Sequence, residues 1–237
     1  MLHGPIKLSI LAFSSALVAS LLLTYFVRER AMRLRLFDPT DERKLHTRPI
    51  PRVGGVAIFL SVSIAIVLVA SLAGFEGAGF ARSKLAVVLV GGAMTHVLGL
   101  YDDLRPLRAR YKFAAQILIA IAVFLAGVRI DTIALPLIGQ IALGNVVGLL
   151  FTIFWFVGIT NAFNLIDGLD GLASGAAMFA LTTMFVVATI NGQAGAALVT
   201  LALAGATLGF LRYNFHPASI FLGDSGSLYL GFMLAGM

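Results

Sequence analysis

The chain has 237 residues, of which 59% are hydrophobic and only 12% are charged, and it contains no cysteine. Average soluble domains are about half apolar and a quarter charged, so this composition excludes an ordinary soluble domain. The absence of cysteine also excludes disulfides and cysteine-ligated zinc. The net charge of +6 could suggest a nucleic-acid partner. In a membrane protein, however, an excess of Lys and Arg on the inner side explains the charge more simply, and we expect no nucleic-acid partner.

Apolar runs of about 15 to 19 residues divide the chain, and runs of this length predict transmembrane helices. In chain order the expected spans are Leu8–Phe26, Gly54–Leu72, Lys84–Leu100, Phe113–Val128, Val146–Thr160, Leu172–Ile190 and Ala194–Leu211. An eighth span begins near Leu228 and covers about half of a bilayer before Met237. The predicted fold is an all-α polytopic integral membrane protein with about eight transmembrane helices, the last one incomplete. We expect one domain, residues 1–237, that forms the N-terminal part of a longer chain.

Basic residues divide the connecting segments into two sets. Thirteen of the 17 Lys and Arg residues fall on one side of the predicted membrane and four on the other. Because Lys and Arg favour cytoplasmic segments, the first set is expected to face the cytoplasm of a bacterium, across its inner membrane. On the outer side, the segment RIDTIALPLIGQIALG (residues 129–144) partly alternates polar and apolar residues and predicts a small external β-hairpin.

Most of the acidic residues are predicted to lie on the cytoplasmic side. Five of them are Asp102, Asp103, Asp167, Asp170 and Asp224. A transporter would more often hold its ionisable residues near the middle of the bilayer. At the membrane boundary, such residues can meet a water-soluble substrate and a lipid headgroup together, which favours an enzyme. An ion-coupled transporter and a non-catalytic membrane protein stay as alternatives.

The motif GLYDDLRPLRARYKF places two adjacent carboxylates at the end of the third span. Pro106 disfavours helix at Arg105, so this span should end close to Asp102 and Asp103. Carboxylates at a helix C-terminus oppose the macrodipole, and helix capping therefore does not explain them. The pair either is solvated and offset by the basic residues that follow, or binds a cation or manages the proton of a phosphate.

The motif IFLGDSGSLYLGF places Asp224 and Ser225 between two glycines just before a predicted helix. One interpretation is an ordinary N-cap. The other is a phosphate site at a helix N-terminus, where Asp224 could hold Mg²⁺ beside the phosphate.

The first cytoplasmic loop contains DERKLHTRPIPRVGG. Pro49 and Pro51 predict an extended segment. His46 and Arg48 belong to a basic cluster that suits a polyphosphate, although such residues can also be simple membrane anchors. Of the other histidines, His96 is expected to be a hydrogen-bonded packing residue, and the role of His216 stays open.

The motif NAFNLIDGLDG carries Asn161, Asn164, Asp167 and Asp170 at three-residue intervals. On a continuous helix each such step lags by about 60°, and the two glycines of the motif disfavour a continuous helix. We expect the fifth span to end near Asn161–Asn164, and a turn to bring Asp167 and Asp170 back toward the same site. The alternative is a loop whose polar residues are merely solvated.

Together, these four motifs resemble the polyprenyl-phosphate N-acetylhexosamine-1-phosphate transferases, which form glycosyltransferase family 4, and the N-acetylglucosaminyl branch most closely. The resemblance covers nearly the whole chain. It implies transfer of N-acetylhexosamine-1-phosphate, in this branch GlcNAc-1-phosphate, from a UDP-sugar to undecaprenyl or another polyprenyl phosphate. The reaction uses Mg²⁺ or Mn²⁺, releases UMP and initiates a cell-envelope glycan. Members carry a later cytoplasmic loop rich in His and Arg, which implies either a longer natural chain, as the half-length last span favours, or an inactive product.

The resemblance also implies roles for ten residues. It matches Asp102, Asp103 and Asp167 to catalytic positions, Asn164 and Asp224 to the metal site, and His46, Arg48, Lys112, Asp170 and Phe221 to substrate contacts. A phosphate monoester is largely dianionic at pH 7, so a strong general base is unnecessary and the division of roles between Asp102 and Asp103 stays open. The expected partners are a UDP-N-acetylhexosamine, a polyprenyl phosphate and the lipid bilayer. The chain is also compatible with a homodimer.

Overall fold

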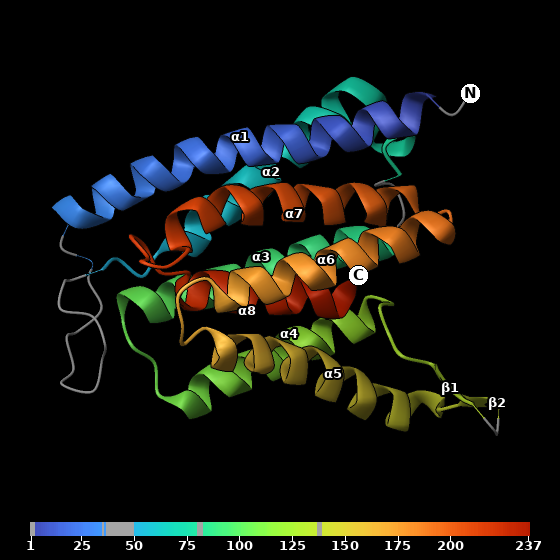
Figure 1. Ribbon diagram of the computed structural model, residues 1–237. Helices are drawn as coiled ribbons and strands as arrows, with labels where there is room; N and C mark the ends of the chain where they lie inside the picture. Colours follow the sequence, from blue (N-terminus) through green and yellow to red (C-terminus); the bar gives the residue numbers. More distant parts are fainter. Residues whose placement is uncertain (1–2, 35, 37–49, 80–82, 137–138) are drawn as a thin grey trace.

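The computed structural model describes residues 3–34, 36, 50–79, 83–136 and 139–237. In this part of the chain, eight α-helices and one two-stranded sheet follow one another (Figure 1). They are α1 (His3–Arg33), α2 (Gly54–Gly77), α3 (Ser83–Leu104), α4 (Ala109–Leu125), β1 (Thr132–Leu135), β2 (Gly139–Ala142), α5 (Gly144–Ile166), α6 (Leu172–Ile190), α7 (Ala194–Asn214) and α8 (Gly223–Gly236).

The helices confirm the prediction of an all-α polytopic membrane protein. Among the described residues, α1, α2, α3, α5, α6 and α7 are long and apolar enough to cross a membrane, whereas α4 has 17 residues and α8 has 14. The helix α1 has 31 residues, or about 46 Å at 1.5 Å per residue, and is therefore longer than a hydrocarbon core of about 30 Å. Its last turn carries Arg30 and Arg33, which favour the negative end of the helix dipole.

One of two predicted boundaries is confirmed and the other is wrong. The helix α5 ends at Ile166, two residues beyond Asn164, and a turn follows it as predicted; both asparagine side chains hydrogen-bond to neighbouring helices. The helix α8 begins at Gly223 instead of Leu228. Its Gly- and Ser-rich first turn is helical because close packing against other helices favours small residues there.

The helix α8 lies in the middle of the bundle, in contact with α2, α3, α5 and α6. All of its residues from Gly223 to Leu234 are buried. A side chain at Gly99 of α3 or at Gly55 of α2 would collide with the backbone of the first turn of α8. These two glycines therefore let α2 and α3 touch the N-terminus of α8, which brings the polar ends of three helices together.

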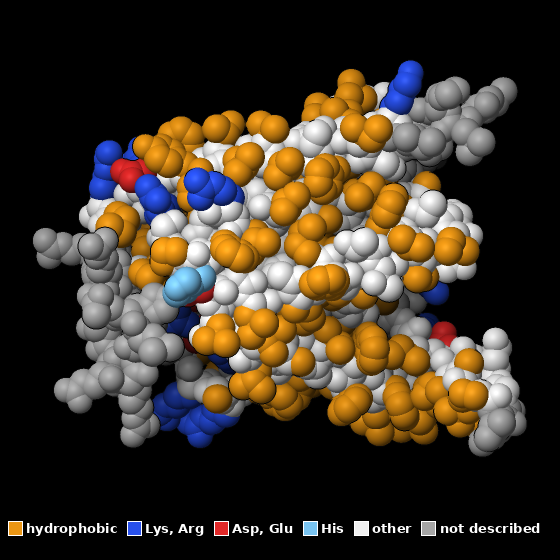
Figure 2. Space-filling model, viewed as in Figure 1, with side chains coloured by type: hydrophobic (Ala, Val, Ile, Leu, Met, Phe, Trp, Pro, Cys, Tyr) orange, Lys and Arg blue, Asp and Glu red, His pale blue; other side chains and the backbone are white. Residues whose placement is uncertain are grey.

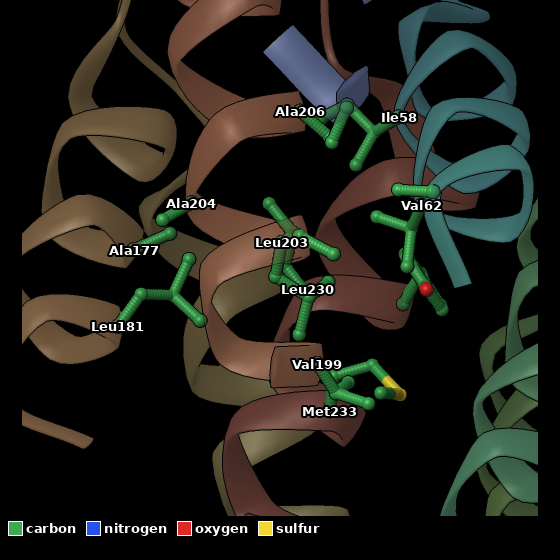
Figure 3. Packing of buried hydrophobic residues seen from close by; sticks show 14 of the residues in the cluster. Ile58, Val62, Ala177, Leu181, Val199, Leu203, Ala204, Ala206, Leu230 and Met233 are labelled. Atoms are coloured by element: carbon green, nitrogen blue, oxygen red, sulfur yellow. The ribbon is translucent and has the colours of Figure 1, made fainter. Parts of the chain in front are cut away.

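Apolar side chains from four helices fill the space around α7 and α8 (Figure 3). The cluster includes Ile58 and Val62 of α2, Ala177 and Leu181 of α6, Val199, Leu203, Ala204 and Ala206 of α7, and Leu230 and Met233 of α8. This core fixes the positions of α7 and α8, and thereby of the segment that joins them.

The two ends of the bundle differ in chemistry. Most of the Lys and Arg residues visible in Figure 2 gather at one end, and hydrophobic side chains cover much of the flank between the ends. The strands β1 and β2 lie at the other end and form an antiparallel hairpin with Thr132 opposite Ala142 and Leu135 opposite Gly139. The predicted hairpin is therefore confirmed, and it lies far along the bundle from the N-terminus of α8.

Candidate active site at the basic end of the bundle

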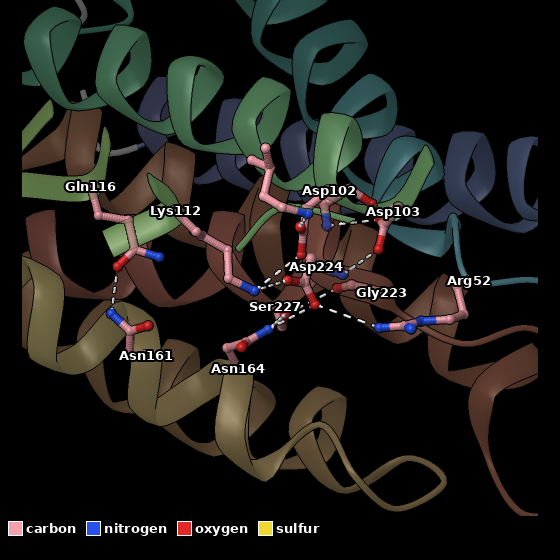
Figure 4. A network of polar contacts seen from close by, with 12 residues as sticks. Arg52, Asp102, Asp103, Lys112, Gln116, Asn161, Asn164, Gly223, Asp224 and Ser227 are labelled. Atoms are coloured by element: carbon pink, nitrogen blue, oxygen red, sulfur yellow. Dashed lines mark hydrogen bonds and ion pairs between the residues drawn. The ribbon is translucent and has the colours of Figure 1, made fainter. Parts of the chain in front are cut away.

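Asp224, in the first turn of α8, lies at the centre of a polar cluster (Figure 4). Its Oδ2 accepts a hydrogen bond from Lys112 Nζ of α4 at 2.5 Å, and its Oδ1 accepts one from Asn164 Nδ2 of α5 at 3.0 Å. The Nη2 atom of Arg52, which precedes α2, lies 3.6 Å from the same Oδ1. Asp224 is only 7% exposed, so three segments far apart in the sequence supply the donors that compensate a buried carboxylate.

Asp103, at the end of α3, holds the N-terminus of α8. Its two carboxylate oxygens accept the backbone N–H groups of Asp224 at 2.8 Å and Ser225 at 2.9 Å. The residue that precedes the helix, Leu222, makes no side-chain cap hydrogen bond. The ordinary N-cap interpretation of the GDSGS motif is therefore wrong, because the cap is a carboxylate from another helix.

Asp102 has different hydrogen-bond partners from those of Asp103. Its Oδ1 accepts the backbone N–H of Leu107 at 2.6 Å, which fixes the connection between α3 and α4. Its Oδ2 accepts a hydrogen bond from Lys112 Nζ at 3.1 Å, so one ammonium group bridges the carboxylates of Asp102 and Asp224. The third span ends at Leu104, close to the carboxylate pair, as Pro106 predicts.

The asparagines of NAFNLIDGLDG lie on α5 and donate hydrogen bonds to different helices. Asn161 donates a hydrogen bond to Gln116 of α4, away from the carboxylates. Asn164 reaches the cluster and also donates to Ser227 Oγ at 2.9 Å. Of the two, therefore, only Asn164 lies where the sequence places the metal site.

Asp167 is the first residue after α5 and lies outside the helices. Its pKa is raised to about 8, mainly by burial and also by the negative charge of Asp224, while the positive charge of Arg52 opposes this rise. Asp167 therefore retains its proton at neutral pH in the absence of an added cation. Its electrostatic interaction with Asp224 and Arg52 places it beside the cluster, as predicted.

The segment between α7 and α8 contains Phe221 and contacts Asp170. Asp170 Oδ2 accepts hydrogen bonds from His216 Nδ1 at 2.9 Å and from the backbone N–H of Ala218 at 3.0 Å. Phe221, the predicted stacking residue, is half-buried, and its backbone N–H donates to the carbonyl oxygen of Pro51 at 2.8 Å. These contacts fix the backbone around Phe221; its contact with a substrate stays a prediction.

Two predicted substrate-contact residues, His46 and Arg48, lie outside the described residues. His96 is confirmed as a packing residue, because its Nδ1 donates to the carbonyl oxygen of Ser225 at 3.0 Å and its ring stacks on Phe59.

Three residues of this end were missed by sequence reasoning: Arg52, Asn214 and Ser227. Arg52 lies in the RPIPRVGG motif and was counted only among the basic residues on the cytoplasmic side, and Ser227 lies in the GDSGS motif. Asn214 ends α7 and donates a hydrogen bond to the carbonyl oxygen of Ile220 at 3.1 Å. A lone amide at the end of an apolar span was the only signal for it.

The donor set suits a hard cation in part. Among the described residues, no group of three or more His, Cys, Asp or Glu side chains is arranged to hold a metal ion. Mg²⁺, however, commonly takes only one or two carboxylates and completes its shell with waters and substrate phosphates. The carboxylates of Asp224 and Asp102, which already face one shared cationic group, fit that requirement, and the side-chain amide of Asn164 lies beside them with its Nδ2 donating to Asp224.

Known proteins are similar to this chain in amino-acid sequence. Residues 85–237 match the family described as glycosyl transferase family 4. The chain is 37% identical over 226 residues to a probable undecaprenyl-phosphate N-acetylglucosaminyl 1-phosphate transferase of Bacillus subtilis, covering 95% of this chain and 61% of that protein. It is 39% identical over 228 residues to the decaprenyl-phosphate N-acetylglucosaminephosphotransferase of Mycobacterium tuberculosis H37Rv, covering 90% and 56%.

A second group of relatives is also similar. The chain is 36% identical over 198 residues to a phospho-N-acetylmuramoyl-pentapeptide-transferase of Desulforamulus reducens, covering 76% of this chain and 57% of that protein. The chain thus spans about three fifths of the length of these relatives. Since the family match covers well over half of the chain and includes the DD, NAFNLIDGLDG and GDSGS motifs, the chain belongs to glycosyl transferase family 4.

Proposed function

We propose that the protein containing this chain transfers N-acetylhexosamine-1-phosphate, most readily GlcNAc-1-phosphate, from a UDP-sugar to a polyprenyl phosphate. An oxygen of the lipid phosphate forms a bond to the β-phosphorus of the donor, and the bond from that phosphorus to the bridging oxygen breaks. UMP leaves with the bridging oxygen and the electron pair. The observation that carries the proposal is the convergence of carboxylates and cations from four motifs on Asp224, at one end of the membrane helices.

Charge is the main obstacle to this reaction, because two anionic phosphates must approach each other. Lys112 and Arg52 bring two positive charges to the N-terminus of α8, where the partial positive charge of the helix also favours anions. We infer that Lys112 contacts a reacting phosphate and that Asp102, which holds its ammonium group, sets its position. No strong base is needed, since the lipid phosphate is largely deprotonated at pH 7.

A divalent cation, Mg²⁺ or Mn²⁺, is the cofactor we propose, and Asp224 with Asn164 would hold it. When bound, it would neutralise the diphosphate of the donor and favour the departure of UMP. Before a cation binds, the raised pKa of Asp167 limits the negative charge that accumulates beside Asp224. Asp170, Phe221, His46 and Arg48 are proposed to contact the nucleotide or sugar.

We also propose that this site faces the cytoplasm at a bacterial inner membrane. The Lys- and Arg-rich end of the bundle supports this orientation, because basic residues favour the cytoplasmic side. A transporter is not favoured, since the relatives are named as transferases and Asp102, Asp103 and Asp224 lie at helix ends.

The direct test uses membranes that contain the complete gene product. They are incubated with undecaprenyl phosphate, Mg²⁺ and a UDP-sugar that carries a radioactive sugar. We expect labelled lipid and UMP to form in equal amounts. If neither product forms with UDP-GlcNAc, UDP-GalNAc or UDP-MurNAc-pentapeptide, the proposed function is wrong.

A variant tests the place of Asp224. We expect Asp224→Asn to lower the transfer rate by about 100-fold or more, as the loss of one preorganised electrostatic group commonly does. The matched control is Asp131→Asn, which changes an exposed aspartate at the hairpin end and should leave the rate unchanged. Wild-type turnover and Mg²⁺ dependence in Asp224→Asn would remove Asp224 from the site.

A further inference from the structure

The turn between α5 and α6, residues 167–171, is exposed in its middle, whereas Gly171 at its end is buried beside Leu211 and Phe215. Gly168 and Leu169 are exposed, and a side chain at Gly168 would meet no other atom within 4 Å. Gly171 has a φ of 71°, a conformation that disfavours other residues. The exposed middle of the turn has few apolar contacts, so the polar contacts on either side of it help to set its position.

Asp170 supplies such contacts, and they lead to the segment between α7 and α8. Its side chain is 6% exposed, and its Oδ2 accepts hydrogen bonds from His216 Nδ1 and from the backbone N–H of Ala218. The His216 side chain, by contrast, is 79% exposed. Burial therefore does not hold the imidazole ring, and its hydrogen bond to Asp170 orients it instead.

The other side of the α7–α8 segment is fixed by its backbone. The N–H groups of Gly54 and Gly55 donate to the carbonyl oxygens of Phe221 at 3.0 Å and Leu222 at 2.8 Å. The segment is thus a firm support that also carries Phe221 to the start of α8. A turn attached to this support has a defined position relative to Asp224.

We propose that His216 is a positioning residue, whose hydrogen bond to Asp170 holds the 167–171 turn against the α7–α8 segment and thereby sets the affinity of the site for the nucleotide sugar. Asp167 begins this turn and interacts with Asp224, so a displaced turn would also displace Asp167. The hydrogen bond from His216 to Asp170, called the clasp below, forms with charged imidazole and with the neutral tautomer that carries its proton on Nδ1. This inference rests on the proposed transferase function for its effect on affinity, but not for its effect on the turn.

Three variants of the complete protein separate the hydrogen bond from the ring. His216→Ala removes both, His216→Phe keeps a ring without a donor, and His216→Asn keeps an N–H donor near the position of Nδ1. We expect Ala and Phe to raise the KM for the UDP-sugar about 5- to 10-fold, as the loss of one hydrogen bond to a charged group can. The KM for polyprenyl phosphate should change less than about twofold. In His216→Asn, the KM values for both substrates should be close to those of the wild type.

Two controls sharpen this kinetic test. Ser219→Ala changes the same segment, but Ser219 Oγ donates to the carbonyl oxygen of Tyr213 and not to the turn, so both KM values should stay as in the wild type. In an Asp170→Ala background, adding His216→Ala should have no further effect, because the acceptor is already absent. Equal changes in both KM values, or unchanged values in His216→Ala, would overturn the proposal.

Hydrogen–deuterium exchange tests the clasp without catalysis. Peptides that cover residues 165–172 should exchange faster in His216→Ala and His216→Phe than in the wild type, and at the wild-type rate in His216→Asn. If the wild type transfers no sugar phosphate, the proposed function fails while this exchange result still decides the clasp. If the wild type is active and exchange in His216→Ala is unchanged, the clasp is wrong and the proposed function stands.

Discussion

Asp102 and Asp103 are adjacent in the chain and chemically identical, yet they hold different parts of the molecule. Asp103 accepts two backbone N–H groups of α8, whereas Asp102 accepts the N–H of Leu107 and the ammonium group of Lys112. One carboxylate therefore fixes a buried helix end, and the other positions a cationic side chain that it shares with Asp224.

The difference has a physical basis in the N-terminus of α8. A helix leaves four N–H groups without partners at its start, and the partial positive charge there favours an anion. The helix α8 has no side-chain cap of its own and is buried, so Asp103 satisfies two of these groups from α3. We therefore expect Asp103 to contribute mainly to stability and Asp102 mainly to turnover, although the family resemblance assigns both to catalysis.

The largest effect should come from Asp103→Ala. Two N–H groups at a buried helix start would lose their acceptors, and we expect the free energy of unfolding to fall by about 2–4 kcal/mol. Denaturant unfolding in detergent measures this change. Asp103→Asn keeps one acceptor oxygen and should lose about half as much.

The control for this comparison is Asp131→Ala, at the hairpin end. Asp131 is exposed, and its removal should change the free energy of unfolding by less than about 0.5 kcal/mol. If Asp103→Ala were as stable as Asp131→Ala, Asp103 would not be the cap of α8, and the comparison would fail.

The sequence predicted the fold class, the eight helices and the hairpin, because apolar length and alternation depend on local residues alone. It also placed Asp102, Lys112, Asn164 and Asp224 near one site, through motifs on one membrane face. It did not separate Asp102 from Asp103, since nothing local tells which carboxylate turns toward α8. The predicted start of α8 is wrong for the same reason: the residue that caps this helix lies 121 positions away in the sequence.

A third carboxylate, Asp167, extends the comparison to pH. Its pKa is about 8 in the folded protein and near 3.9 in an unfolded chain, so between these values the folded protein binds the proton more strongly. The free energy of unfolding should therefore fall as pH rises from about 4 to about 8 and level off above that. The slope is at most about 1.4 kcal/mol per pH unit, and we expect less than half of this because Asp167 is only partly buried.

Unfolding of the wild type and of Asp167→Asn at pH 5 to 9, with a chelator present, measures this contribution. The other titrating groups are common to both proteins and largely cancel in the difference. Relative to the wild type, Asp167→Asn should become more stable as pH rises. A difference that does not depend on pH would show that Asp167 titrates as an ordinary exposed carboxylate.

The smallest effect on stability should come from Asp102→Asn, and it gives the sharpest contrast with Asp103. The amide keeps an oxygen for the N–H of Leu107 and loses the charge that faces Lys112, which still contacts Asp224. We expect the free energy of unfolding to fall by less than about 1 kcal/mol, as for a partly exposed ion pair. The turnover rate should nevertheless fall about 10-fold or more, with the KM for the UDP-sugar little changed, because Lys112 would no longer be held toward the reacting phosphate. If Asp102→Asn instead unfolded the protein and Asp103→Asn only slowed turnover, the two carboxylates would have the opposite roles.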